Sequence, residues 1–344
     1  MKPAPAIAIV YNAYEPRPTA TGERLSEESV AEMAQQAHEA VRSLGLGVTL
    51  VPLQRSLLNF LGRVKELAPD ALINLCEGFC GRPQWESNVA GIFELLGLTF
   101  TGNASKTLAI CQDKFKAKAV LRAAGLPTAP AQVMLTGDEP LELRFPLIVK
   151  PNNEDASLGI YPESVVRDEE ALRRQVRRCL DNYKQPVLVE GFIDGREFNV
   201  SVMENGTVTP LPVSEIDFSA MPKDMPRILG YEAKWFEDNP LYQKTPPVCP
   251  APIDDEMRVR LQGLAAAAFR TMGCRDYARV DFRMDAKGRP FILEVNPNPD
   301  ISTNAGYARA LKAAGIEYAA FWGTMVRNAM ERRVVHDPAD AGAR

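Results

Sequence analysis

The sequence predicts an α/β N-terminal domain with a parallel sheet, followed by an α+β part built from two subdomains. Three observations support this prediction. Short apolar runs alternate with helical segments over residues 1–103, which is typical of an open, largely parallel α/β layer. Further along, two runs with strand-like alternation flank a short turn and predict a β-hairpin. With 344 residues, the chain also exceeds the size that one hydrophobic core usually supports.

Residues 1–103 form the expected N-terminal domain. Apolar runs predict strands over residues 6–11, 48–52 and 71–76. The helix expected over residues 26–44 has Ser26 in a capping position, acidic residues in its first turn and Gly45 after its last turn. A further helix is expected near residues 88–96.

The two subdomains are expected to span residues 104–186 and 187–333, and residues 334–344 to be a disordered tail. The first subdomain contains a helix, a buried strand and a polar loop: residues 113–124, 145–150 and 151–159. The second contains three strands at residues 187–192, 197–203 and 207–213. A long loop with Pro222 and Pro226, a helix over residues 254–272 and the hairpin over residues 277–298 follow.

Composition excludes several classes of function. The net charge of −4, with both signs interspersed, makes nucleic acid an unexpected partner. No run is long and apolar enough to span a bilayer and the N-terminus lacks a signal-peptide pattern, so we expect a cytoplasmic protein. Six scattered cysteines fit reduced thiols, and Cys76 and Cys80 lack the second cluster that a zinc site requires.

Motifs that are missing narrow the choice further. The two histidines, His38 and His336, lie on a predicted helix and in the tail, which disfavours Ser-His-Asp and Cys-His hydrolases. The phosphate-loop signature and the dinucleotide fingerprint are also absent from the sequence. A nucleotide would therefore need another scaffold.

The hairpin has the residues that give the clearest indication of the chemistry of this protein. Its apolar face is expected to hold Val280, Phe282, Met284, Phe291, Leu293 and Val295, and the opposite face Arg279, Asp281, Glu294 and Asn296. Facing carboxylates require a compensating cation, and hard oxygen ligands of this kind suit Mg²⁺. The alternative is a solvated face on which Arg279 and Arg283 neutralise the two carboxylates.

Four segments precede the hairpin in a fixed order: Asp113-Lys114-Phe115, Val149-Lys150-Pro151, the run from Glu190 to Phe198, and Tyr231-Glu232-Ala233-Lys234-Trp235. With the hairpin, they resemble the motifs of the ATP-grasp superfamily, and specifically its D-alanine–D-alanine ligase branch. The resemblance extends from about residue 74 to residue 315. It implies an ATP-grasp fold, in which two α+β subdomains hold ATP between two sheets, and it allows a homodimer.

The resemblance implies a role for each motif residue. Lys114 and Lys150 would contact the phosphates of ATP, Glu190 and Phe192 would lie at the adenine, and Glu197 would bind the ribose hydroxyls. A lysine that ends an apolar run, as Lys150 does, is costly unless it has an anionic partner. For Lys114, a solvent-facing position like that of Lys116 and Lys118 remains an alternative.

The remaining roles concern the reaction. Lys234 would approach the γ-phosphate, although a salt bridge to Glu232 or Glu237 is the alternative. Arg279 would stabilise the tetrahedral intermediate, and Ser157, in a lid formed by residues 152–159, would donate to a phosphate. The hairpin residues Asp281, Glu294 and Asn296 would ligate one or two Mg²⁺ ions, or Mn²⁺.

The implied activity is an ATP-dependent carboxylate–amine ligase of the dipeptide type. The γ-phosphoryl group would first form an acyl phosphate with a carboxylate substrate, and an amine would then displace phosphate, leaving ADP and phosphate as products. The substrates would be small amino acids or amines. A small-molecule kinase of the same fold and a non-catalytic nucleotide-binding protein remain as alternatives.

The substrate side departs from the family pattern. The family's His-Gly after the third strand is Glu77-Gly78 here, a lid serine is Ala156, and Asp300 replaces a glycine. The first substrate's glutamate has no secure counterpart; Glu15 or Glu23 could substitute. Expected substrate contacts are Glu15, Glu77, Trp235, Asp300 and Ser302.

These changes make a strict D-alanine–D-alanine ligase an unexpected outcome. An acidic pocket favours a substrate with an extra amine, or an acceptor without a free carboxylate. Alternatively, Glu77 and Asp300 form structural ion pairs with Arg82, Arg227 or Arg309.

Overall fold

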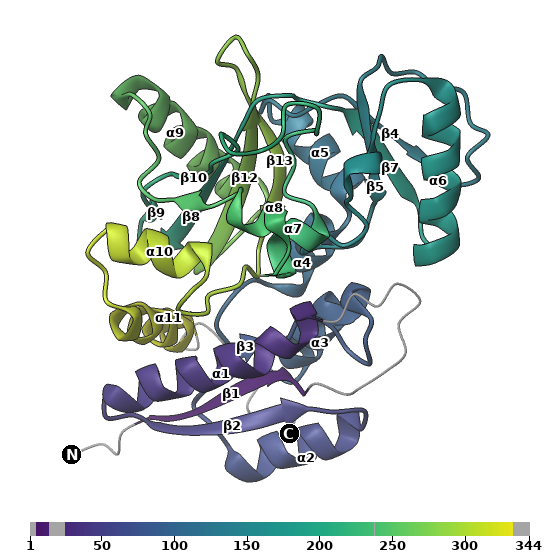
Figure 1. Ribbon diagram of the computed structural model, residues 1–344. Helices are drawn as coiled ribbons and strands as arrows, with labels where there is room; N and C mark the ends of the chain where they lie inside the picture. Colours follow the sequence, from purple (N-terminus) through teal and green to yellow (C-terminus); the bar gives the residue numbers. More distant parts are fainter. Residues whose placement is uncertain (1–4, 14–24, 237, 333–344) are drawn as a thin grey trace.

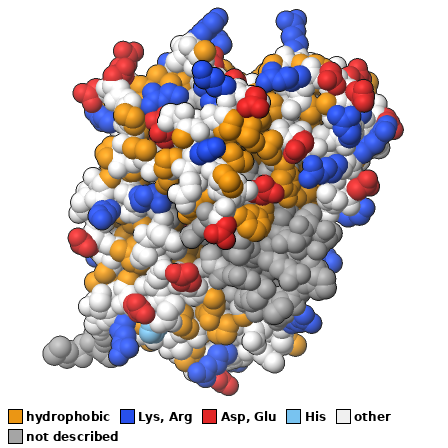
Figure 2. Space-filling view, in the orientation of Figure 1, with side chains coloured by type: hydrophobic (Ala, Val, Ile, Leu, Met, Phe, Trp, Pro, Cys, Tyr) orange, Lys and Arg blue, Asp and Glu red, His pale blue; other side chains and the backbone are white. Residues whose placement is uncertain are grey.

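The computed structural model describes residues 5–13, 25–236 and 238–332, which form three sheets in sequence order. Figure 1 shows the N-terminal sheet below the other two, with the six-stranded and four-stranded sheets side by side above it. Charged side chains of both signs are interspersed over the face shown in Figure 2. No helix within the described ranges has the length and apolar character that crossing a membrane requires.

The N-terminal sheet is parallel, as predicted. Its order is β2-β1-β3, with β1 at Ala6–Asn12, β2 at Gly47–Leu53 and β3 at Ala71–Leu75. Alternation along β1 places Ile7 and Ile9 in a core with helix α1 (Leu25–Ser43), and Ala8 and Val10 in a core with α2 (Leu57–Leu67) and α3 (Glu86–Leu95). The helices predicted over residues 26–44 and 88–96 are thus confirmed.

The C-terminus of the described chain returns to this domain. Helix α11 (Tyr318–Arg332) packs against α1 and β3, and α10 (Gly306–Ala313) precedes it. Neither helix was predicted. The expected domain boundaries stay a prediction; β7 (Val187–Gly191) pairs within the central sheet although the expected boundary placed it in the last segment. The expected tail lies outside the described residues.

The central sheet is antiparallel and four-stranded. Its order is β4-β7-β5-β6, with β4 at Ala131–Met134, β5 at Leu147–Pro151, β6 at Val165–Val166 and β7 at Val187–Gly191. Helix α6 (Glu169–Tyr183) covers it, capped by Asp168, whose side chain accepts from the Ala171 N–H. The strands β5 and β7 were predicted; β4, β6 and α6 were not. Helices α4 (Ser105–Gln112) and α5 (Lys114–Ala123) connect this sheet to the N-terminal domain.

The third sheet has six strands in the order β11-β10-β8-β12-β13, with β9 also paired to β8. Its strands are β8 Arg196–Glu204, β9 Val208–Pro210, β10 Ser214–Ile216, β11 Pro247–Val248, β12 Tyr277–Met284 and β13 Pro290–Asn296. Helix α9 (Asp255–Thr271) packs on one face together with α5. The strand expected over residues 207–213 is wrong in length: β9 ends at Pro210, and a second proline at 212 cannot donate to a ladder.

The hairpin is confirmed, with one correction. Arg279 lies opposite Asn296 and Asp281 opposite Glu294, so the predicted polar face is correct. A bulge follows Asp281, and beyond it Phe282 pairs with Ile292. The extra residue, Leu293, shifts the alternation, so Ile292 and not Leu293 or Phe291 lies in the core with Val280 and Phe282.

The long loop of the third segment also contains short helices. These are α7 (Tyr231–Trp235) and α8 (Pro240–Gln243). Short 3-10 helices lie at Pro83–Trp85 and Pro162–Ser164, and all six cysteines are free thiols.

Candidate active site

A cavity of about 410 Å³ lies where loops of all three sheets meet. The N-terminal domain contributes the loop after β3, the central subdomain the loop after β5, and the third segment α7 and the end of the hairpin. Predicted site residues that line the cavity are Glu77, Lys234, Trp235, Arg279, Glu294, Asn296 and Asp300. Apart from Lys234, the residues expected at the nucleotide do not line this cavity; they are Lys114, Lys150, Glu190, Phe192 and Glu197.

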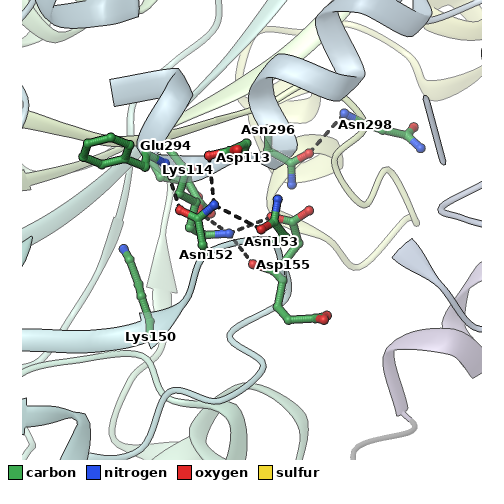
Figure 3. A network of polar contacts seen from close by, with 12 residues as sticks. Asp113, Lys114, Lys150, Asn152, Asn153, Asp155, Glu294, Asn296 and Asn298 are labelled. Atoms are coloured by element: carbon green, nitrogen blue, oxygen red, sulfur yellow. Dashed lines mark hydrogen bonds and ion pairs between the residues drawn. The ribbon is translucent and has the colours of Figure 1, made fainter. Parts of the chain in front are cut away.

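Lys114 is held at the start of α5 by a compact polar network (Figure 3). Asp113 caps the helix, and the Asn152 side chain donates to Asp113 and accepts from the Phe115 N–H. The Lys114 side chain is 4 % exposed, and its Nζ donates to the Glu154 carbonyl and, at 3.1 Å, to Asp155. The solvent-facing alternative for Lys114 is therefore wrong.

The ammonium group of Lys114 also lies 3.7 Å from Glu294 of the hairpin. Burial alone would lower the pKa of Lys114, but the charges of Asp155 and Glu294 outweigh it and raise the pKa. Lys114 therefore stays positively charged between the two subdomains.

The other two lysines of this helix differ from each other. Lys116 is 74 % exposed and pairs with Asp113, whereas Lys118 is 1 % exposed and was missed by the sequence analysis. Lys118 Nζ lies 2.7 Å from one oxygen of Glu190 and donates to Thr128 at 2.9 Å. A signal was present: Lys118 follows Lys114 by one helical turn and so shares its face.

Glu190 bridges two buried lysines. Its second oxygen lies 2.6 Å from Lys150 Nζ, which confirms that the lysine ending this apolar run has an anionic partner. Burial would raise the pKa of Glu190, but the ammonium groups of Lys118 and Lys150 lower it to about 2. One carboxylate faces two cations, so this buried cluster has an excess positive charge.

Glu197 and Phe192 lie beside a buried arginine. Arg283 donates to Glu197 at 2.8 Å and to the Ile193 carbonyl, and its guanidinium lies 5.6 Å from the ring centroid of Phe192. Burial raises the pKa of Glu197, opposed by Arg283. Arg283 therefore neutralises Glu197 and not Glu294, contrary to the solvated-face alternative.

Arg279 does neutralise its neighbour on the hairpin. Its Nε and Nη2 each donate to Asp281 at 2.7 Å, in a two-point ion pair. Burial would lower the pKa of Arg279, but Asp281 outweighs it and raises the pKa. The solvated-face alternative is thus correct for Arg279 and Asp281.

The predicted metal ligands are adjacent oxygens of one surface. Asp281 faces Glu294 across the hairpin. Asn296 lies two pairs further along on the same face, and its side-chain oxygen accepts from the Asn298 N–H at 3.1 Å. Within the described ranges, no three acidic, histidine or cysteine side chains form a metal-binding group. Two carboxylates and a carboxamide oxygen still fit Mg²⁺, which commonly uses one or two protein carboxylates together with substrate phosphates.

The predicted lid is tied to α7. The Trp235 indole N–H donates to the Ala156 carbonyl at 3.0 Å, the Ser157 hydroxyl to the Leu229 carbonyl at 3.0 Å, and the Tyr231 N–H to the Ile160 carbonyl at 2.9 Å. Lys234 lies between lid and hairpin, with Nζ 5.3 Å from the centroid of the Trp235 ring. Burial and the charge of Arg279 lower the pKa of Lys234. Loops of two subdomains thus close over one side of the site.

On the substrate side, the structural ion pairs considered for Glu77 and Asp300 are not formed. Arg227 pairs with Asp194, Arg309 donates to the Asn304 carbonyl, and Arg82 stacks on Trp85. Both Glu77 and Asp300 line the cavity.

Ser302 supports this wall from behind, since its hydroxyl donates to Asp300 at 2.6 Å. A further cavity residue, Glu86, was missed; its position in the first turn of α3 suits an acidic side chain on electrostatic grounds alone. Glu15 and Glu23 lie outside the described residues.

Comparisons with known proteins agree with this geometry. Residues 120–327 match the family model described as D-ala D-ala ligase C-terminus. The chain belongs to the D-alanine–D-alanine ligase family. It is 32 % identical to a D-alanine--D-alanine ligase of Bordetella petrii over 92 % of each chain, and 33 % identical to the uncharacterized protein y4sG of Sinorhizobium fredii over 89 % of this chain and 87 % of that protein.

Solved structures give the same fold. A D-alanine--D-alanine ligase of Bacillus anthracis complexed with ATP has a TM-score of 0.75 at 21 % identity, covering 96 % of this chain and 99 % of its own. The ATP-grasp prediction is therefore confirmed, and the family identifies the protein as an ATP-dependent enzyme that forms C–N bonds. The role of each site residue stays a prediction.

Proposed function

We propose that this protein is a carboxylate–amine ligase of the dipeptide type that works through an acyl phosphate and is not a strict D-alanine–D-alanine ligase. The observation that carries the proposal is the cavity, which brings Arg279 and Asn296 of the hairpin together with Lys234 of α7. An arginine, a lysine and oxygen ligands around one space suit a reaction in which negative charge develops on phosphoryl and acyl groups.

The nucleotide would lie beside the cavity, between the two larger sheets. The buried cluster of Lys118, Lys150 and Glu190 has two cations and one carboxylate, and Lys114 adds a third cation, 3.7 Å from Glu294. A triphosphate would supply the missing negative charge. Glu197, beside Arg283 and Phe192, is placed to accept hydrogen bonds from a ribose diol.

Magnesium would be held by Asp281, Glu294 and Asn296, with Mn²⁺ as an alternative. When bound, the ion neutralises charge on the phosphates during phosphoryl transfer. Asp281 already pairs with Arg279, so this carboxylate would orient the guanidinium as well as contribute an oxygen ligand.

The reaction has two steps. A substrate carboxylate oxygen attacks the γ-phosphorus of ATP; the new P–O bond forms as the bond to ADP breaks, with Lys234 offsetting the charge. An amine then attacks the acyl carbon, and Arg279 stabilises the oxyanion until the C–O bond to phosphate breaks and the amine proton is lost. Water would destroy the acyl phosphate, and the tie between Trp235 and Ala156 excludes it.

Relatives at 30–34 % identity are named D-alanine--D-alanine ligases, so D-alanine is the natural reference substrate. A pocket containing Glu77 and Asp300 is unfavourable for an acceptor with a free carboxylate because like charges repel. The substrates would therefore be small amino acids or amines whose charge pattern differs from that of D-alanine.

Phosphate release with Mg-ATP should be measured against single and paired L- and D-amino acids and small amines, followed by mass spectrometry. The proposal expects a condensed product together with ADP. A stable phosphorylated product would instead identify a small-molecule kinase, and ATP binding without any turnover would identify a non-catalytic protein. Efficient synthesis of D-alanyl-D-alanine alone would refute the departure from the family's substrate.

A further inference from the structure

Three carboxyl groups on the cavity wall form no salt bridge within residues 5–13, 25–236 and 238–332. They are Glu77 after β3, Glu86 in the first turn of α3, and Asp300 after the hairpin. The ion pairs of the described chain involve other carboxylates. The charges of the three groups on the wall are offset only from a distance, by Lys234 acting on Glu77 and by Lys234 and Arg279 acting on Asp300.

The basic side chains around the cavity make their close contacts with other groups, although Lys234 lies near enough to Glu77 to lower its pKa. Arg279 is held by both oxygens of Asp281. Arg82 stacks on Trp85, with its guanidinium 4.6 Å from the ring centroid. Arg55 also takes part in an interaction within the structure. Lys234 stacks on Trp235. None of them forms a salt bridge with the three carboxylates.

Glu86 is fixed in place although it is 8 % exposed. The Asn298 side chain donates to Glu86 Oε1 at 2.8 Å and to the Cys76 carbonyl at 3.1 Å, which locks the carboxylate to the loop after β3. The other oxygen, Oε2, has no hydrogen-bond partner in the described part of the chain, and Glu86 lines the cavity. This oxygen is not a fully buried unpaired atom; it is open to the cavity, where a ligand can donate to it without displacing a protein partner.

The neighbours of Glu86 are also positioned. The Glu77 N–H donates to Asn12 at 2.6 Å, and Asp300 accepts from both the N–H and the hydroxyl of Ser302. Burial and the charges of Glu86, Asp300 and Asp155 raise the pKa of Glu77 well above its ordinary value, and burial raises the pKa of Glu86 to about 8. Placing these groups together costs free energy that a bound cation would offset.

We propose that this wall binds a positively charged group on the amine substrate, so that the substrate is a diamine or a basic amino acid derivative with a second ammonium group. The inference rests on the proposed ligase function and names the class of its amine substrate. Glu77 and Glu86 bind the second ammonium group, while Arg279 and Lys234 remain at the reacting groups.

Lysinamide and norleucinamide are the probes, because they differ only by one ammonium group. The D- and L-forms of each are titrated calorimetrically into the Mg-ADP-loaded protein. We expect one form of lysinamide to bind at least about tenfold more tightly than the matching norleucinamide, equivalent to about 1.4 kcal/mol. Glu77→Gln and Glu86→Gln should each remove most of this difference. Glu142→Gln, an exposed carboxylate outside the cavity, should leave it unchanged.

Equal binding of the two probes, or binding of neither, would overturn the inference. A preference for lysinamide that survives both glutamine variants would do the same. Circular dichroism of each variant checks that the fold is retained. Charge-selective binding without any condensation with Mg-ATP would leave the inference standing and refute the ligase. Condensation of uncharged amines without charge selectivity would refute the inference and leave the ligase function standing.

Discussion

Replacing Lys118 by methionine should destabilise the protein far more than replacing its neighbour Lys116. The Lys118 side chain is buried, pairs with Glu190 at 2.7 Å and, through Thr128, connects α5 to the Ile292 carbonyl of β13. Removing one partner of a buried ion pair typically costs about 3–5 kcal/mol. Glu190 keeps its contact with Lys150, so we expect the lower end, about 3 kcal/mol.

Thermal unfolding of the nucleotide-free protein, followed by fluorescence and circular dichroism, measures this loss. At about 2–4 °C per kcal/mol, Lys118→Met should lower Tm by about 6–12 °C. Lys116→Met is the matched control, because it removes the same charge two residues away on the exposed face of the same helix, where a salt bridge contributes about 0–1 kcal/mol. Equal Tm values for the two variants would refute the reasoning that the cluster is a buried, interdependent unit.

Three further predictions concern the site. Arg279→Lys should lower substrate-dependent phosphate release by about 100-fold or more, as loss of an oxyanion donor does, while the ATP affinity measured by calorimetry stays close to that of the wild type. Unchanged phosphate release would exclude the role assigned to Arg279. Trp235→Phe removes the hydrogen bond to Ala156, so the ratio of phosphate to condensed product should rise, and a ratio that stays at one would contradict the water-excluding lid. Glu86 has a folded-state pKa of about 8 against 4.5, so the folded state retains a proton that the unfolded chain has lost. Its contribution to stability therefore falls as pH rises from about 4.5 to 8, and Glu86→Gln should raise Tm more at pH 8 than at pH 6; an equal shift at both would contradict the assignment.

The anionic partner of Lys150 and the polar face of the hairpin could be predicted from the sequence because their signals are local. Lys150 ends an apolar run, and this position alone required an anionic partner, which the structure identifies as Glu190. The polar face of the hairpin followed from the two-residue period of strands. That period failed at Leu293, where a bulge depends on pairing across the hairpin, which no local pattern encodes.

The burial of single charged side chains was harder to predict. Lys116 and Lys118 occur in the same run of alternating lysines, and their difference arises from which face of α5 meets the central sheet. Glu86 belongs to α3 in the N-terminal domain, yet its hydrogen-bond partner Asn298 lies 212 residues later. Contacts over such separations come from the arrangement of domains, so only the three-dimensional structure places Glu86 at the cavity.

The ties between the lid and α7 also have a kinetic consequence. On the proposed mechanism, the predicted lid must open at least once per turnover to exchange ADP for ATP. The bonds from Trp235, Ser157 and Tyr231 lie close together along both segments, so they break as a group during opening. On that mechanism, the lifetime of the closed loops would govern the departure of ADP, and turnover would be slow even where the chemistry of bond formation is fast.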